Sequence, residues 1–211
     1  MTGNREKGSI LGGVFPREYD FEGMLVRQAE KTEEGVRMFV RWLKERPDSD
    51  PADLVQFESE VDDLRHGMED RLVRAFSTPF DRQDIYTLSR QMDYVLNFSV
   101  ETSLEMHAFG ISPDPAILEM AEALAEGTTI LARGIRLLPR DPLAVEGIIK
   151  EARAAMYAMD RRYIRATADL FREGDPMAAL KKREVYHHLR DAARALRDTV
   201  DLLHRTAVGI G

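Results

Sequence analysis

Four oxygen-bearing side chains stand at helical spacing in two neighbouring stretches of the sequence. Glu58 and Asp62 are four residues apart, and so are Asp93 and Asn97. Residues four apart share one face of an α-helix, so each pair can point in one direction. If adjacent antiparallel helices bring the two pairs together, the four oxygen ligands suit a hard cation: Mg²⁺, Ca²⁺, Mn²⁺ or iron. The alternative is that these carboxylates simply coat an exposed helix face.

A second pattern places a histidine three residues after an acid. It occurs at Asp63/His66, Glu184/His187 and Asp201/His204. Glu-x-x-His on two helices is typical of di-iron carboxylate bundles. Only one of the three pairs contains glutamate, and the other segments lack the partner glutamates at the required spacing. A di-iron or other metal-dependent helical-bundle enzyme is therefore the alternative function and not the favoured one.

Six segments between prolines must position these side chains. Because proline breaks helix interiors but is tolerated at helix starts, the nine prolines act as boundaries. Apolar residues recur at helical spacing in every segment, and none alternates with period two over a useful length. The pattern predicts an all-α fold of six long antiparallel helices, at about 17–46, 52–78, 80–112, 116–138, 143–175 and 177–211.

Weak internal similarity divides the chain into two repeats. We expect a flexible lead-in at residues 1–16 and one helical domain over residues 17–211. The repeats are about 17–112 and 113–211, each a three-helix bundle, related by a pseudo-twofold axis. In the third segment, Thr78 is expected to cap a helix that Pro79 opens, with Asp81 and Asp84 in its first turn.

Composition narrows the function further. The chain has 211 residues, no cysteine and a net charge of −7, which excludes thiolate metal sites and argues against nucleic-acid binding. No stretch is apolar enough to span a membrane, and the N-terminus does not read as a secretory signal, so we expect a cytoplasmic protein. Basic clusters at Arg161, Arg162 and Arg165 and at Lys181–Arg183 indicate either a surface for anionic lipid or an acidic partner, or a solvated helix face.

The residue order of the third segment adds a family resemblance. Thr78-Pro-Phe-Asp-Arg-Gln-Asp-Ile-Tyr-Thr-Leu88, followed by Met92-Asp93, closely resembles the PhoU-like family. The nearer match is the branch that accompanies Pit-type inorganic phosphate transporters. The resemblance implies two three-helix bundles and a non-enzymatic role in regulating phosphate uptake at the inner membrane face. It also implies metal binding through paired acidic motifs, one pair in each repeat.

The motifs of the first repeat map onto Glu58, Asp62, Asp93 and Asn97, the last of which departs from the usual carboxylate. The motifs of the second repeat fall on Met156 and Asp160 and on Arg194 and Asp198. Methionine and arginine cannot replace two carboxylates, so we expect one metal site at most. Arg194 is instead expected to pair with Asp160 or Asp198.

The favoured function is therefore an accessory protein that docks on a Pit-type phosphate transporter from the cytoplasm. Peripheral association with the membrane and homo-oligomers are compatible with this role. A further alternative is a purely structural interaction scaffold that binds no ligand.

Overall fold

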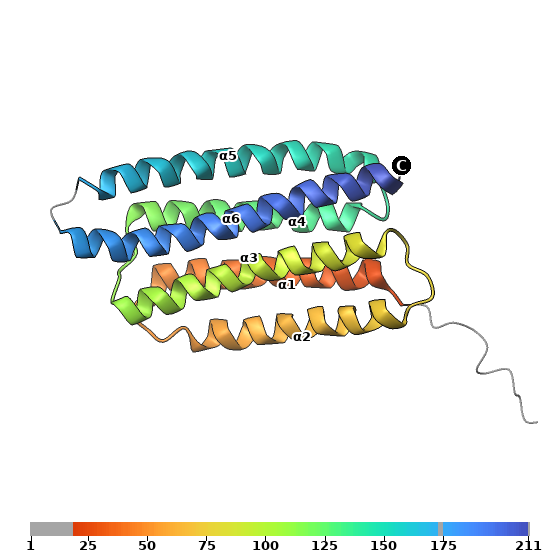
Figure 1. The fold of residues 1–211 in the computed structure, drawn as a ribbon, viewed down its shortest axis with the longest axis horizontal. Coiled ribbons are helices and arrows are strands. Elements are labelled where there is room, and N and C mark those ends of the chain that lie inside the picture. Colours follow the sequence, from red (N-terminus) through yellow and green to blue (C-terminus); the bar gives the residue numbers. More distant parts are fainter. Residues whose placement is uncertain (1–18, 173–174, 211) are drawn as a thin grey trace, which may run out of the picture.

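The computed structural model describes residues 19–172 and 175–210, and within these ranges it contains helices and no strand. The helices are α1 (Phe21–Glu45), α2 (Ala52–Arg74), α3 (Arg82–Phe109), α4 (Pro115–Leu137), the short 3₁₀ turn η2 (Pro142–Ala144), α5 (Val145–Leu170) and α6 (Pro176–Ile210). Figure 1 shows the six long helices running back and forth along one axis. The predicted all-α fold of six long antiparallel helices is confirmed. The predicted lead-in at 1–16 lies outside the described residues.

The helices form two three-helix bundles. Helices α1, α2 and α3 pack on one another, and α4, α5 and α6 do the same. The bundles join where α1 packs on α4 and α3 packs on α6. Helices α2 and α5 are therefore the outer helices, at the bottom and top of Figure 1, and each packs mainly on the two other helices of its bundle.

One continuous apolar core runs through both bundles. The predicted stripes supply it: the four apolar residues of the third segment, Ile85, Leu88, Met92 and Val95, are all buried. Close approach between helices also requires a small residue on α4. A Cβ atom added to Gly127 would lie 2.6 Å from Leu196 Cδ2 and 2.7 Å from Met156 Cε, so glycine lets α5 and α6 pack closely on α4.

Polar contacts inside the core fix how helices align. Gln28 on α1 and Ser89 on α3 are fully buried and bond to each other. Gln28 Nε2 donates to the Ser89 carbonyl oxygen (2.9 Å), and Ser89 Oγ donates to Gln28 Oε1 (2.6 Å). Between the bundles, Thr206 Oγ1 on α6 donates to Asp84 Oδ2 on α3 (3.1 Å). Buried polar groups must find partners, so such pairs favour one alignment over others.

Aspartate side chains begin most of the helices. Asp20 accepts from the backbone N–H of Gly23 at the start of α1 (2.8 Å), and Asp114 accepts from Ile117 N–H at the start of α4 (2.9 Å). Asp175 accepts from Met177 N–H at the start of α6 (2.9 Å). Each carboxylate satisfies a donor that has no partner within its helix and lies at the positive end of the helix dipole.

The start of α3 corrects a prediction. Helix α3 begins at Arg82, and its cap is Asp81, whose Oδ1 accepts from the N–H groups of Gln83 (2.7 Å) and Asp84 (3.2 Å). Pro79 lies in the preceding turn and does not open the helix, and Thr78 Oγ1 donates to the Phe80 carbonyl oxygen instead. A carboxylate that accepts from two backbone donors is a stronger cap than a hydroxyl that competes for one.

This correction gives a direct test. Replacing Asp81 by alanine should lower the free energy of unfolding by about 1 kcal/mol, because two N–H groups lose their acceptor. Replacing Thr78 by alanine should cost less than about 0.5 kcal/mol, since its contact lies outside the helix. Urea unfolding of both variants measures the difference. Equal losses, or a larger loss in Thr78→Ala, would place the functional cap at Thr78.

No helix among the described residues is long and apolar enough to cross a membrane.

Candidate functional site

Helices α2 and α3 bring the four predicted site residues into one neighbourhood. Asp93 on α3 has only 5% of its side chain exposed, and its Oδ1 lies 3.4 Å from Arg65 Nε on α2. The same Nε donates to Asp62 Oδ1 (2.8 Å). Asn97 Nδ2 donates to Asp93 Oδ2 (3.3 Å), and Glu58 lies close enough to Asp62 and Asp93 to feel both charges. The two acidic edges therefore converge, which is the condition that the predicted site required.

The centre of this cluster is an arginine that sequence reasoning missed. The Arg65 side chain is only 7% exposed and bonds to three carboxylates: Asp62, Asp93 and also Glu69, whose Oε1 accepts from Arg65 Nη1 (2.8 Å). Burial alone would lower the pKa of Arg65, but the hydrogen bonds to Asp62 and Glu69 outweigh it and raise that pKa above its ordinary value. Arg65 is therefore a permanent cation among the acids. We name these four residues, Asp62, Arg65, Glu69 and Asp93, the Arg65 cluster.

A sequence signal for Arg65 existed. It stands three residues after Asp62 and four before Glu69, so all three side chains share one face of α2. What the spacing could not show is that this face packs against α3, where Asp93 adds a third carboxylate to the same guanidinium.

His66 extends the cluster toward solvent. Its Nδ1 lies 3.2 Å from Asp62 Oδ2, and its Nε2 lies 2.9 Å from Arg65 Nη2. A neutral imidazole with its proton on Nδ1 satisfies both contacts, since it donates to the carboxylate and accepts from the guanidinium. The acidic partner of His66 is thus Asp62, not the Asp63 of the acid-x-x-His pattern.

The second bundle neutralises the matching place with a different arginine. On α5, Asp160 corresponds to Asp62, and its Oδ2 accepts from Arg197 Nη1 of α6 (2.9 Å). The expected pairing of Arg194 with Asp160 or Asp198 is wrong, because Arg194 pairs with Asp191 on its own helix (3.3 Å). Arg197, one turn further along α6, is the arginine that faces α5. In both bundles, an arginine holds the acid of the outer helix.

The donor set as it stands does not fit a metal ion. Asp62 Oδ1 and Glu69 Oε1 accept from the Arg65 guanidinium, and Asp62 Oδ2 faces His66 Nδ1, so these carboxylates are already engaged, whereas cation ligands must be free to coordinate. Asn97 Oδ1 is a buried oxygen without a hydrogen-bond partner. Over residues 19–172 and 175–210, no group of three or more His, Asp or Glu side chains is arranged to hold a metal. The metal site at Glu58, Asp62, Asp93 and Asn97 stays a prediction.

Glu58 is the member of the predicted set whose charge is least compensated. Burial raises its pKa above the ordinary value of 4.5, and the neighbouring charges of Asp62 and Asp93 raise it further. Burial likewise raises the pKa of Asp93, and the Arg65 guanidinium only partly offsets this. A raised pKa means that the charged carboxylate destabilises the folded state.

Replacing Glu58 by glutamine should therefore stabilise the protein at neutral pH, by up to about 1 kcal/mol for a partly exposed group that water screens. The cost of the charge is fully present above the raised pKa. It shrinks as the pH falls and disappears below 4.5, so the advantage of Glu58→Gln should vanish there. Thermal melting of wild type, Glu58→Gln and the control Glu60→Gln across pH measures this. A loss of stability in Glu58→Gln at neutral pH would instead indicate that a cation uses this carboxylate.

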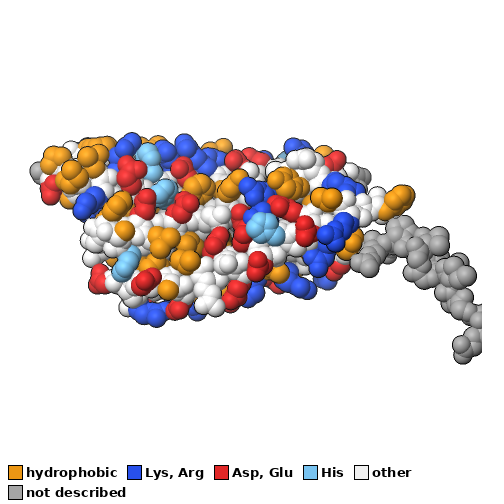
Figure 2. Space-filling model, turned by 60° about the horizontal axis from the view of Figure 1, so that its bottom comes forward, with side chains coloured by type: hydrophobic (Ala, Val, Ile, Leu, Met, Phe, Trp, Pro, Cys, Tyr) orange, Lys and Arg blue, Asp and Glu red, His pale blue; other side chains and the backbone are white. Residues whose placement is uncertain are grey.

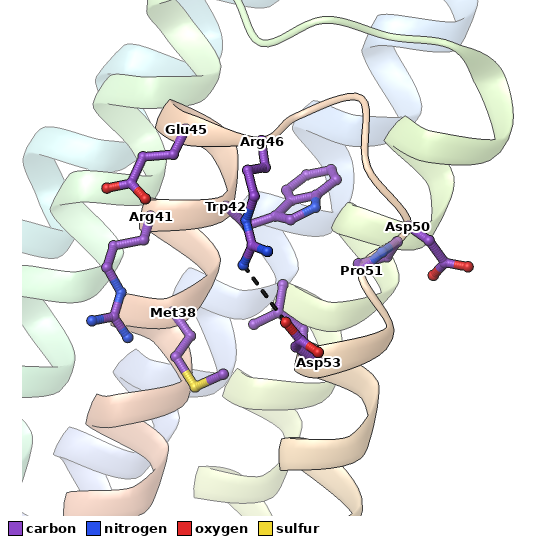
Figure 3. A pocket seen from close by; sticks show the side chains of 9 residues that line it. Met38, Arg41, Trp42, Glu45, Arg46, Asp50, Pro51 and Asp53 are labelled. Atoms are coloured by element: carbon purple, nitrogen blue, oxygen red, sulfur yellow. Dashed lines mark ion pairs between the residues drawn. The ribbon is translucent and has the colours of Figure 1, made fainter.

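A small hollow lies at the α1–α2 turn, away from the Arg65 cluster (Figure 3). Its volume is about 140 Å³, and an ion pair between Arg46 and Asp53 (3.6 Å) crosses it. The buried Trp42 forms one wall and donates from Nε1 to the Ser49 carbonyl oxygen (3.1 Å). The single tryptophan therefore packs the turn, and the hollow is smaller than the roughly 300–1,000 Å³ typical of ligand pockets.

Solved structures of other proteins share this architecture. The fold matches crystal structures of two proteins of Shewanella oneidensis MR-1. One is a PhoU-like protein (TM-score 0.74, 15% identity, 90% of this chain and 99% of that one). The other is described as a "putative PhoU-like phosphate regulatory protein" (TM-score 0.75, 16% identity, 93% and 99%). At this identity, the likeness establishes the fold, which is PhoU-like.

Two curated proteins are also similar to the chain in sequence. No family model matches the chain. The chain is 29% identical over 189 residues to the UPF0111 protein YkaA of Bacillus subtilis, covering 82% of this chain and 87% of that protein. It is 26% identical over 155 residues to a "Putative pit accessory protein" of Rhizobium meliloti, covering 70% and 72%. The resemblance to the PhoU-like family and its Pit accessory branch is confirmed.

Proposed function

We propose that this protein is a non-enzymatic accessory protein of inorganic phosphate transport that docks on a Pit-type transporter from the cytoplasm. The observation that carries the proposal is the similarity to the "Putative pit accessory protein" over 70% of the chain, together with the PhoU-like fold. The phosphate-related role follows from these relatives, and the docking is our inference.

The chemistry of the described residues supports a role without catalysis. Three of the aspartates that could have served as acid, base or ligand are paired with an arginine: Asp62 and Asp93 with Arg65, and Asp160 with Arg197. Glu58 has no such ion pair among the described residues, but its raised pKa reflects burial and neighbouring carboxylates. His66 bonds to this network, and the His187 ring packs on Tyr163 (5.8 Å between centroids). A general acid or base must be free to exchange a proton with substrate, whereas these groups support the helices.

Binding to the transporter is the decisive measurement. A Pit-type transporter encoded in the same genome would be placed in nanodiscs of zwitterionic lipid, with empty nanodiscs as the control. We expect the protein to bind only the transporter discs and to change the rate of phosphate uptake in matching proteoliposomes. Equal binding to both discs, together with unchanged uptake, would refute the proposal.

The cation prediction needs its own measurement. Elemental analysis would compare the purified wild type with Glu58→Ala, Asp93→Ala and the control Glu60→Ala. Metal that is present in wild type and Glu60→Ala but lost from the other two would place a cation at the predicted residues. Equal metal content in all four proteins would remove that site.

Measurements on the same purified protein also test the two alternative functions. Iron in the purified protein together with oxygen consumption would favour a di-iron enzyme. Melting that neither chelator nor added metal changes, with no binding to the transporter, would favour a ligand-free scaffold.

A further inference from the structure

The outer face of α5, together with its C-cap Phe171, carries a row of large apolar side chains that no other helix covers. Tyr157, Ile164 and Phe171 follow one another at intervals of seven residues and are 65%, 65% and 61% exposed. Seven residues make almost two helical turns, so the three side chains line up on one stripe. Helix α5 packs on α4 and α6 through its other side, where Val145, Ile149, Met156 and Leu170 are buried.

Arginines flank this row on one side. Arg161 and Arg165 are exposed, and neither forms an ion pair with the residues described by the structure. Both line a shallow groove of about 420 Å³ beside the start of α4, together with Arg162, which pairs with Glu119 (3.4 Å). The two arginines therefore present uncompensated positive charge in a protein whose net charge is −7.

The same character continues past the α5–α6 turn. Met177 and Leu180 at the start of α6 are exposed, and Lys181 stands beside them. Figure 2 shows hydrophobic side chains gathered next to Lys and Arg at the end of the molecule that carries this turn. We name the apolar row, Arg161, Arg165, Met177, Leu180 and Lys181 the α5 outer face.

The spacing of the apolar side chains favours a lipid surface over a folded protein partner. Successive members of the row are about 10 Å apart along a convex helix, so they form separate points and not a contiguous patch. A stable protein interface buries roughly 800 Å² on each partner with close packing. Interfacial helices instead insert isolated aromatic and aliphatic side chains among headgroups, while neighbouring arginines reach anionic lipid phosphates.

We propose that the α5 outer face binds the surface of an anionic phospholipid bilayer, with Tyr157, Ile164 and Phe171 among the headgroups. Arg161 and Arg165 contact the lipid phosphates. This inference goes beyond the proposed function, because it requires no transporter.

Co-sedimentation with vesicles that contain no transporter tests the proposal. The full chain should bind phosphatidylcholine vesicles that contain phosphatidylglycerol, bind pure phosphatidylcholine far more weakly, and lose binding as salt rises. Arg161→Gln/Arg165→Gln should weaken binding about 25-fold, at about fivefold for each charge. Ile164→Ser/Phe171→Ser should weaken it as well. The control Arg71→Gln/Arg74→Gln, on the opposite outer helix, should bind as wild type does.

Because all substituted side chains are exposed, the variants should fold, and their helical circular dichroism and melting check this. Equal binding to both vesicle types, or equal loss in the α2 control, would overturn the proposal. So would self-association in sedimentation velocity that Ile164→Ser/Phe171→Ser abolishes, without any vesicle binding, since the face would then hold a second copy. The result stands apart from transporter docking, which is measured in zwitterionic discs.

Discussion

Replacing Arg65 by methionine is expected to lower the free energy of unfolding by about 3 kcal/mol. Methionine keeps much of the apolar stem but removes the guanidinium, which leaves Asp62, Glu69 and Asp93 without a counterion. Removing one partner of a buried ion pair costs roughly 3–5 kcal/mol, and we take the lower end because Asp62 and Glu69 reach water. Asp93, with 5% of its side chain exposed, contributes most of the loss.

Urea unfolding of Arg65→Met measures this effect, and Arg74→Met, an exposed arginine on the same helix, is the matched control. The control should change stability by less than about 1 kcal/mol. Adding Asp93→Asn to Arg65→Met should recover part of the loss, because the buried carboxylate that lacked a counterion is gone. A small effect of Arg65→Met, or no recovery in the double variant, would show that Arg65 is not the cation on which the cluster depends.

The second large effect is expected at Gln28. Replacing it by alanine should cost about 2–4 kcal/mol, since it removes both bonds to Ser89 and leaves a cavity between α1 and α3. Ser89→Ala should cost about 1–3 kcal/mol, because it leaves Gln28 Oε1 buried without a donor.

The double variant Gln28→Ala/Ser89→Ala completes a thermodynamic cycle. Its loss should be smaller than the sum of the two single losses, because the hydrogen-bonded pair can be lost only once. Strict additivity in urea unfolding would mean that the two side chains act independently and do not align α1 with α3.

The number and packing of the helices were predictable because prolines and apolar stripes both mark them. On the fifth segment, apolar residues at helical spacing, among them Val145, Ile148 and Met156, are buried, as the recurring pattern predicted. Helix starts were less certain, since Thr78-Pro79 and Asp81 both carry capping chemistry. The backbone N–H groups of Gln83 and Asp84 turn toward Asp81, and this choice depends on the local path of the chain.

The location of the candidate site was predictable from the sequence, but the buried arginine at its centre was not. The spacing of Glu58, Asp62, Asp93 and Asn97 identified the region where α2 meets α3. It could not reveal the burial of Arg65, because an arginine beside acids on an amphipathic helix usually faces water.

In the second bundle, the sequence likewise could not show how α6 is rotated about its axis. Arg194 and Arg197 are three residues apart on α6, and the rotation of that helix decides which of them reaches Asp160. The row at Tyr157, Ile164 and Phe171 also repeats at helical spacing, so its sequence pattern looks like that of a core stripe. Only the packing of α5 shows that it faces outward.

The outer positions of α2 and α5 give the molecule an electrical polarity. Helix α2 carries seven acidic and three basic side chains, whereas the opposite outer helix presents the uncompensated Arg161 and Arg165. Separated charge of this kind is a permanent dipole moment. A negatively charged surface would exert a torque on this dipole before contact and turn α5 toward that surface. The molecule would therefore arrive already oriented, with α2 facing the bulk solution.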